Sequence, residues 1–171
     1  MSNDEWGTPD WLYDELNREF SFNCDVCASK SNFKHPNFYS KELSGLDRSN
    51  FWGTSNWCNP PYSNTLPWLE RAEEESDRGN NTVILMMADC STKAFAFAAS
   101  RAQEIRLINQ RIKFDGAVGS PRFSSMLVIF YAFGVKWNRQ PYNEGAAIRL
   151  IRYEPKLVGR KHGRETAKKN G

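Results

Sequence analysis

Apolar residues recur along the chain in two patterns, one with helical spacing and one in short continuous runs. Leu12, Leu16 and Phe20 repeat at helical spacing, which predicts a helix over residues 9–19. The pair Thr8-Pro9 is typical of a helix start, because threonine can cap the helix and proline fits its first position.

Two further helices are predicted in the middle of the chain. One spans residues 63–78, where Pro67 fits the first turn and Gly79 ends the pattern. The other spans residues 92–102, whose phenylalanine and alanine residues fall in helical register.

Strands are predicted where apolar residues run together between polar stretches. The clearest covers residues 82–88, which are apolar on both faces, as in a sheet that is covered on both sides. A short apolar strand around Asp25 is predicted within residues 21–28. Further strands are predicted over residues 104–108, 111–114, 125–133 and 147–153.

The order of these elements indicates an α/β fold. Strands that alternate with helices, followed by strands in succession, favour a central, mostly parallel sheet with an antiparallel edge. At 171 residues the chain fits one domain, which we place at residues 1–155, with a separate tail at 156–171. Ligands of open α/β sheets bind outside the carboxyl ends of the strands, where Asp25 and residues 59–62 are expected to lie.

Composition and charge narrow the class of protein. With 40% hydrophobic and 25% charged residues and no run near the roughly 20 apolar residues of a membrane span, we expect a cytoplasmic protein without a membrane partner. The net charge is +3, and six lysines and arginines fall in residues 156–171. This basic tail is either a solubilising segment or a mobile arm that binds phosphate groups.

Four cysteines raise the question of a metal site. Cys24 and Cys27 have the spacing of a metal-binding pair, but Cys58 and Cys90 are isolated and the chain has only two histidines. A structural zinc site normally shows two paired clusters. The pattern therefore favours free thiols, mostly buried, in a reducing compartment, and no bound metal.

The stretch Asn59-Pro60-Pro61-Tyr62 carries the candidate chemistry, because a strand must end at two adjacent prolines. The side-chain carbonyl of Asn59 and the backbone carbonyl of Pro60 could each accept a hydrogen bond from an exocyclic amine, which frees its lone pair to attack. Tyr62 offers a ring on which a planar base could stack, and Pro61 fixes the separation of amide and ring. This is catalysis by positioning and polarisation, without a covalent enzyme intermediate.

The same four residues have a plainer interpretation. They could form a rigid turn in which Asn59 caps the next helix and Tyr62 packs on the core. The position of the stretch, after a predicted strand and directly before a predicted helix, favours the catalytic interpretation.

The sequence resembles the phage-encoded DNA N6-adenine methyltransferases of the Dam type. The motif at residues 59–62 is similar to the Asn/Asp-Pro-Pro-Tyr motif of amino-methyltransferases that use S-adenosyl-L-methionine. Five more matching stretches occur in the family's order and extend the resemblance over residues 5–133: EWGTPDWLYDEL, FSFNCDVCA, ADCSTKAF, EIRLINQRIKF and SSMLVIF.

The resemblance implies a fold, a reaction and a set of site residues. The fold would be the Rossmann-like class I methyltransferase fold without a separate target-recognition domain, and the reaction would be direct methyl transfer to adenine N6 of a base flipped out of DNA. Asn59, Pro60, Pro61 and Tyr62 would be catalytic. The cofactor would contact Trp6, Thr8, Pro9, Asp25, Cys27, Ala28, Glu42 and Asn59. The DNA would contact Tyr62, Phe114, Arg111, Arg122 and Arg139.

Several of these roles stay open at the level of sequence. No glycine-rich loop follows Asp25, so either Glu42 or Asp47 could bind the cofactor ribose, and both could be solvated loop charges. Phe114 could be the second face of the base pocket or an ordinary core residue. Loops at 115–124 and 136–146 could read the DNA sequence or touch only phosphate.

Other functions fit the same motif. RNA adenine methyltransferases and glutamine methyltransferases of translation factors also carry Asn-Pro-Pro-Tyr. A non-catalytic binder of DNA or of a host factor, which keeps the fold without the cofactor, is a further alternative. The sequence does not indicate the oligomeric state.

Overall fold

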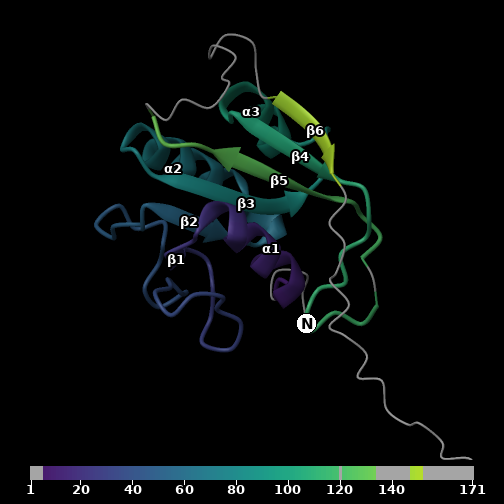
Figure 1. The fold of residues 1–171 in the computed structure, drawn as a ribbon, viewed down its shortest axis with the longest axis horizontal. Helices are drawn as coiled ribbons and strands as arrows, with labels where there is room; N and C mark the ends of the chain where they lie inside the picture. The colour runs from purple at the N-terminus through teal and green to yellow at the C-terminus, as the bar shows by residue number, and fades with distance from the viewer. Residues whose placement is uncertain (1–5, 120, 134–146, 152–171) are drawn as a thin grey trace, which may run out of the picture.

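A mixed sheet forms the centre of the structure, with helices on both of its faces (Figure 1). The computed structural model describes residues 6–119, 121–133 and 147–151. In this part of the chain the sheet has six strands in the order β1-β2-β3-β5-β4-β6. Their bounds are Cys24–Asp25 for β1, Ser55–Cys58 for β2, Asn81–Met87 for β3, Glu104–Ile108 for β4, Ser125–Phe130 for β5 and Ala147–Ile151 for β6.

Five of these strands run in one direction, and β5 runs against its two neighbours. The predicted α/β class and the mostly parallel sheet are confirmed. The antiparallel strand, however, was expected at an edge, and β5 lies inside the sheet between β3 and β4. The edges are β1 and β6, and both pair in parallel with their neighbours. The succession β4 to β5 revealed an antiparallel pair but not its place in the order.

One face of the sheet is covered by α1 (Asp10–Phe20). Leu12 and Leu16 are fully buried there against strand residues such as Val83 and Leu85. Trp57 of β2 joins this layer, with its ring edge-on to Tyr13. The helical spacing of apolar residues in α1 therefore exists because a single stripe of the helix faces the sheet.

The opposite face is covered by α2 (Leu66–Asp77) and α3 (Lys93–Arg101). Leu69 and Ala98 pack there against Ile84 of β3 and Val128 of β5. Neighbouring positions of β3 alternate between the two layers, because successive side chains of a strand point to opposite faces. This explains why the strand is apolar along its whole length.

The predicted elements agree with the structure except in two places. The strand predicted within residues 21–28 is reduced to Cys24–Asp25, although it ends at the expected carboxylate. The strand predicted over residues 111–114 is wrong. Ile112 and Phe114 are buried between exposed neighbours, as in a strand, but this segment pairs with no other strand of the described chain.

A short 3-10 helix at Tyr62–Asn64 precedes α2 and was not anticipated as a separate element. No described helix combines the length and apolarity that crossing a lipid bilayer requires. The predicted tail at 156–171 lies outside the described residues.

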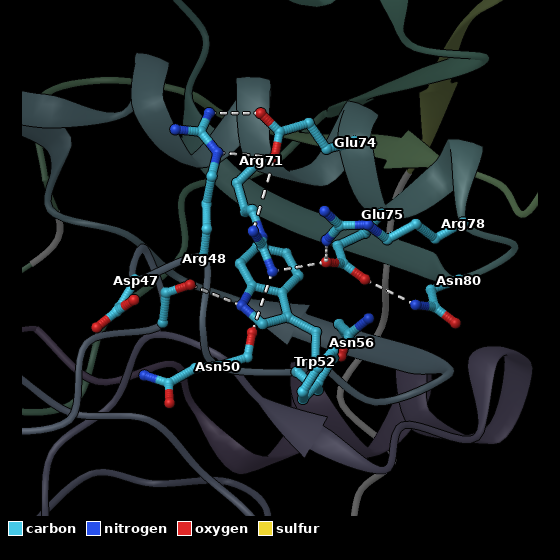
Figure 2. Close-up of polar contacts among 12 residues, drawn as sticks. Asp47, Arg48, Asn50, Trp52, Asn56, Arg71, Glu74, Glu75, Arg78 and Asn80 are labelled. Atoms are coloured by element: carbon cyan, nitrogen blue, oxygen red, sulfur yellow. Dashed lines mark hydrogen bonds and ion pairs between the residues drawn. The ribbon is translucent and has the colours of Figure 1, made fainter.

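The polar segment between β1 and β2 is fastened to α2 by the buried side chain of Arg71 (Figure 2). Arg71 and Glu75 of α2 are only 3% and 2% exposed at their side chains, and they pair at 2.8 Å. Arg71 also donates to the backbone carbonyl of Asn50 at 3.1 Å and lies over the ring of Trp52. The Trp52 indole in turn donates to the Gly45 carbonyl at 2.8 Å. These contacts hold the segment against the helix.

Removing Glu75 should therefore destabilise the protein strongly. Glu75→Ala leaves the buried Arg71 guanidinium with only a longer ion pair to Glu74, at 3.6 Å, and losing the buried partner of a charge costs about 3–5 kcal/mol. Glu75 also accepts hydrogen bonds from Arg78 and Asn80, which would be lost with it. The free energy of unfolding, measured by chemical denaturation, is the test.

A matched control lies on the same helix surface. Arg48 pairs with Glu74, and its side chain is 72% exposed. Arg48→Ala should change the free energy of unfolding by less than about 1 kcal/mol, because solvent screens exposed pairs. Equal effects of the two substitutions would contradict a special role for the buried pair.

Candidate active site

Four segments meet at the edge of the sheet formed by the carboxyl ends of β1, β2 and β3. Asp25 is the last residue of β1, and Asn59 directly follows β2. The connection at residues 109–124 leaves the carboxyl end of β4 and returns to β5, which begins opposite Met87 at the end of β3. The residues before α1 complete this edge. Topology alone therefore brings these distant segments together.

A cavity of about 730 Å³ opens between these segments. Its volume is in the range of sites for small molecules and cofactors. The walls come from the N-terminal segment, the end of β1, the loop after it, residues 40–44, the turn after β2 and α2. The lining residues are Trp6, Gly7, Thr8, Asp25, Cys27, Ala28, Ser29, Lys30, Ser31, Asn32, Ser40, Lys41, Glu42, Ser44, Asn59, Pro61 and Trp68.

Asp25 brings a buried carboxyl group to this cavity. The residue is 2% exposed, and burial raises the pKa of its carboxyl group from 3.8 to about 6. Backbone N–H groups of Lys34 and Cys27 donate to it at 2.9 and 3.3 Å, and this opposes the effect of burial on the pKa. A carboxylate held in this way is suited to a cationic ligand group, because a positive charge would compensate the unfavourable burial.

Thr8 brings a buried hydroxyl group without a partner. The residue is 2% exposed, and among the described residues its Oγ1 has no hydrogen-bond partner. It does not cap α1 as the sequence predicted, because Pro9 occupies the cap position and no side chain bonds there. Buried polar groups are normally hydrogen-bonded, so an orphaned hydroxyl in a cavity wall indicates a polar ligand.

The amide of Asn59 is fixed in orientation by the N-terminal segment. Its Nδ2 donates to the Trp6 backbone carbonyl at 3.1 Å. The side-chain oxygen is therefore turned away from that carbonyl and can act as an acceptor. Asn59 does not cap the following helix, whose cap position is Thr65.

The N-terminal segment is itself held by a backbone bridge. Gly7 and Asp115 exchange two hydrogen bonds, with N–H to carbonyl distances of 3.1 and 2.9 Å. Lys34 adds ion pairs to Asp10 at 2.6 Å and to Asp115 at 3.5 Å. The segment that carries Trp6 and Thr8 is thereby attached to the connection at 109–124.

Tyr62 does not line the larger cavity. It lines a second cavity of about 200 Å³ together with residues of the 3-10 helix, the end of β3 and the start of α3. The hydroxyl of Tyr62 is buried, and burial raises its pKa above the ordinary value. The motif thus contributes to both cavities, with Asn59 and Pro61 in the wall of the larger one and Tyr62 in the wall of the smaller one.

Tyr62 of the motif belongs to an aromatic cluster with Trp6, Phe114 and Phe123. The rings of Phe114 and Phe123 stack on Trp6 at 5.7 and 6.2 Å, and both meet Tyr62 edge-on at 6.0 and 5.3 Å. Phe114 is buried, and its ring is perpendicular to that of Tyr62. Of the two interpretations of Phe114, this geometry favours a core residue over a second face on which the base stacks. Phe123 was not anticipated from the sequence, because a single phenylalanine in a polar stretch carries no periodic signal.

The other predicted site residues are placed as follows. Cys27, Ala28 and Glu42 line the larger cavity, whereas Asp47 does not and instead accepts hydrogen bonds from Ser49. Pro60 is buried within the turn, and Pro9 caps α1 away from the cavity lining.

Two of the predicted DNA contacts, Arg111 and Arg122, line neither cavity. Arg111 and Arg122 are exposed on the connection at 109–124, where Arg111 donates to the Pro121 carbonyl at 2.6 Å. Arg139 and the loop at 136–146 lie outside the described residues.

Several lining residues were missed by sequence reasoning. Lys30 and Lys41 add positive charge to the cavity wall, and Trp68 of α2 adds an aromatic side chain. Ser29 and Asn32 form a tight turn in which the Ser29 N–H donates to the Asn32 side chain at 2.7 Å. A turn of small polar residues after a strand was the available signal.

The four cysteines are free thiols. Cys24 and Cys58 are buried, and burial raises the pKa of both thiols. Cys90 is exposed and Cys27 half-buried, so the predicted burial applies to only two of the four. In the described residues no group of three or more potential metal ligands is present.

Replacing Thr8 tests whether its hydroxyl serves the fold or a ligand. Thr8→Val should leave the free energy of unfolding unchanged or raise it by about 1 kcal/mol, because it removes an unsatisfied buried group of similar shape. Thr65→Val is the matched control, since the Thr65 hydroxyl donates to the Pro61 carbonyl at 3.3 Å and its loss should cost about 1 kcal/mol. A large loss of stability in Thr8→Val would assign the hydroxyl to the fold.

Comparison with known proteins relates this geometry to a family. A family sequence profile described as "DNA N-6-adenine-methyltransferase (Dam)" matches residues 1–144. A relative from Haemophilus phage HP1 (strain HP1c1), named "DNA N-6-adenine-methyltransferase", is 39% identical over 115 residues, which are 65% of this chain and 66% of that protein. A protein of the same name from Escherichia phage T1 is 34% identical over 105 residues, 60% of this chain and 43% of the relative. The matches therefore span just under two thirds of the first relative and under half of the second.

Proposed function

This chain belongs to the Dam family of DNA N-6-adenine-methyltransferases, and we propose that it transfers the methyl group of S-adenosyl-L-methionine to the N6 amine of an adenine in DNA. The observation that carries the proposal is that residues 59–62 contribute to the walls of two cavities. Methyl transfer requires that donor and acceptor are held close together, and a motif shared by two cavities supports such an arrangement.

The larger cavity suits the cofactor. S-adenosyl-L-methionine carries an ammonium group and a sulfonium centre, and the buried carboxylate of Asp25 offers a complementary negative charge. The carboxylate of the cofactor would pair with Lys30 or Lys41. The ribose hydroxyl groups of the cofactor would bind Glu42 or the unpartnered hydroxyl of Thr8. When bound, the cofactor supplies an electrophilic methyl group.

The amide of Asn59 would activate the acceptor. Its nitrogen is engaged by the Trp6 carbonyl, so its oxygen is left to accept an N–H of the adenine amine. A second acceptor at the Pro60 carbonyl would complete a clamp that favours a pyramidal nitrogen with a free lone pair. The preorganised acceptors stabilise the positive charge that develops on this nitrogen.

The smaller cavity suits the target base. A single adenine, swung out of the helix, would lie against the ring of Tyr62 and near the side chains at the end of β3. Trp6, Phe114 and Phe123 contribute by holding the Tyr62 ring in place through edge and stacking contacts. In this interpretation Phe114 contacts the Tyr62 ring and does not contact the base.

Cofactor affinity should rise as the pH increases through about 6. The pKa of Asp25 is raised to about 6, so the carboxyl group is largely protonated below this pH and cannot attract the ammonium group. The dissociation constant, measured by calorimetry between pH 5 and 8, should fall with rising pH and level off above pH 7.

Two variants separate this effect from other titrations. Asp25→Asn should bind more weakly at pH 8 and lose the pH dependence. His35 also acts electrostatically on Asp25, so His35→Asn is the control that should keep the dependence. A pH dependence that is lost in His35→Asn and kept in Asp25→Asn would refute the role of Asp25.

Removing the amide of Asn59 should lower methyl transfer to near the limit of detection. Asn59→Ala deletes the acceptor for the amine, and the loss of one preorganised group of this kind lowers kcat on the order of 10²–10³-fold. Asn59→Asp keeps an acceptor oxygen and should retain measurable transfer. Cofactor binding, followed by calorimetry, should persist in both variants. Near-normal turnover of Asn59→Ala would contradict the mechanism.

The experiment that tests the function itself is transfer of a labelled methyl group from S-adenosyl-L-methionine to unmethylated DNA. Nucleoside analysis of the digested product should show N6-methyladenine, and the Asn59→Ala protein should give none. Transfer only to RNA, or only to a protein glutamine, would replace the proposal with the corresponding alternative. Failure to bind the cofactor would identify the chain as a non-catalytic binder.

A further inference from the structure

The connection at residues 109–124 presents one apolar side chain to solvent beside the candidate active site. Val118 is as exposed as in a free peptide. Its neighbour Ala117 packs inward, against the same core as Tyr62 and Phe123. The connection is thus anchored to the catalytic motif at its base while its tip displays Val118.

The backbone around Val118 is shaped to project this side chain. Gly116 and Gly119 have φ values of 80° and 90°, a region that side-chain-bearing residues rarely adopt. The Gly119 N–H donates to the Ala117 carbonyl at 3.1 Å, which closes a tight turn with Val118 at its centre. Arg111 clamps the base of the connection through the Pro121 carbonyl. A single exposed valine is unremarkable on a protein surface, but one held out by such a turn is not.

The surroundings of the tip are positively charged. Arg111, Lys113 and Arg122 are exposed, and none of them forms an ion pair with another described residue. The acidic side chain in this stretch, Asp115, is paired with Lys34. Cations around an apolar tip are complementary to the phosphates and stacked bases of a nucleic acid duplex.

We propose that Val118 is a wedge that enters the base stack of duplex DNA when the target adenine is flipped out. This inference rests on the proposed function and extends it to the step before methyl transfer. A flipped base leaves a gap in the stack, and an apolar side chain that fills the gap disfavours its return. The cations beside the tip would hold the phosphates on either side.

The test separates flipping from chemistry. The adenine methylated by the wild-type protein is first mapped on plasmid DNA, and short duplexes carrying that site are prepared with the target adenine paired either to thymine or to a mismatched cytosine. A mismatched base is cheaper to extrude, so it lessens the need for a wedge. Methyl transfer by Val118→Ala and Val118→Ser is then measured on both duplexes.

On the matched duplex we expect kcat to fall at least tenfold in both variants. On the mismatched duplex the same variants should come within threefold of the wild type. Phe51→Ala is the matched control, because Phe51 is also strongly exposed but lies in the segment before β2 and not in the connection at 109–124. It should not affect either duplex.

Other outcomes overturn the proposal. Unchanged kcat of Val118→Ala on the matched duplex would show that no wedge is needed at this position. An equal loss on both duplexes would assign Val118 to the structure of the connection. Absence of transfer by the wild-type protein would instead refute the proposed function, so the two failures are distinguishable.

Discussion

The hydrogen bond from the Asn59 side chain to the Trp6 carbonyl joins the walls of the candidate site. It ties the end of β2 to the N-terminal segment, and the bridge between Gly7 and Asp115 ties that segment to the connection at 109–124. The turn after β2, the N-terminal segment and the connection at 109–124 therefore hold one another in position. Because the Asn59 nitrogen donates to this carbonyl, its side-chain oxygen is turned away from Trp6, so the bond fixes the direction from which the oxygen can accept a hydrogen bond.

The direction of the strands explains why these segments can meet. Parallel strands place their carboxyl ends at one edge, so Asp25 and Asn59 become neighbours although they are far apart in sequence. The reversed direction of β5 brings the chain back to the same edge, because β5 must begin where β4 ends. The connection between them can then carry Phe114 and Phe123 to the back of the motif. A parallel β5 would need a crossover and would place these rings elsewhere.

Local patterns in the sequence predicted the helices and most of the strands. Each helix buries one apolar stripe against the sheet, and the central strands bury side chains on both faces. The motif at 59–62 was also predictable, since two prolines after an apolar pair end a strand and leave little freedom. The failures share a physical cause. Residues 111–114 alternate in burial like a strand, but no strand in the described part of the chain pairs with them. The unpartnered hydroxyl of Thr8 and the stacking of Phe123 depend on contacts with distant segments, which local periodicity does not encode.

The absence of a glycine-rich loop after Asp25 has a structural counterpart. Residues of the segment between β1 and β2 form this wall of the cavity, with Ser29, Lys30 and Glu42 among them. Because this segment has little regular structure, contacts with other elements of the fold must fix its conformation. The buried side chain of Arg71, which is paired with Glu75, holds the segment against α2 through its hydrogen bond to the Asn50 carbonyl. Glu75 therefore supports this wall indirectly, because it compensates the buried charge of Arg71.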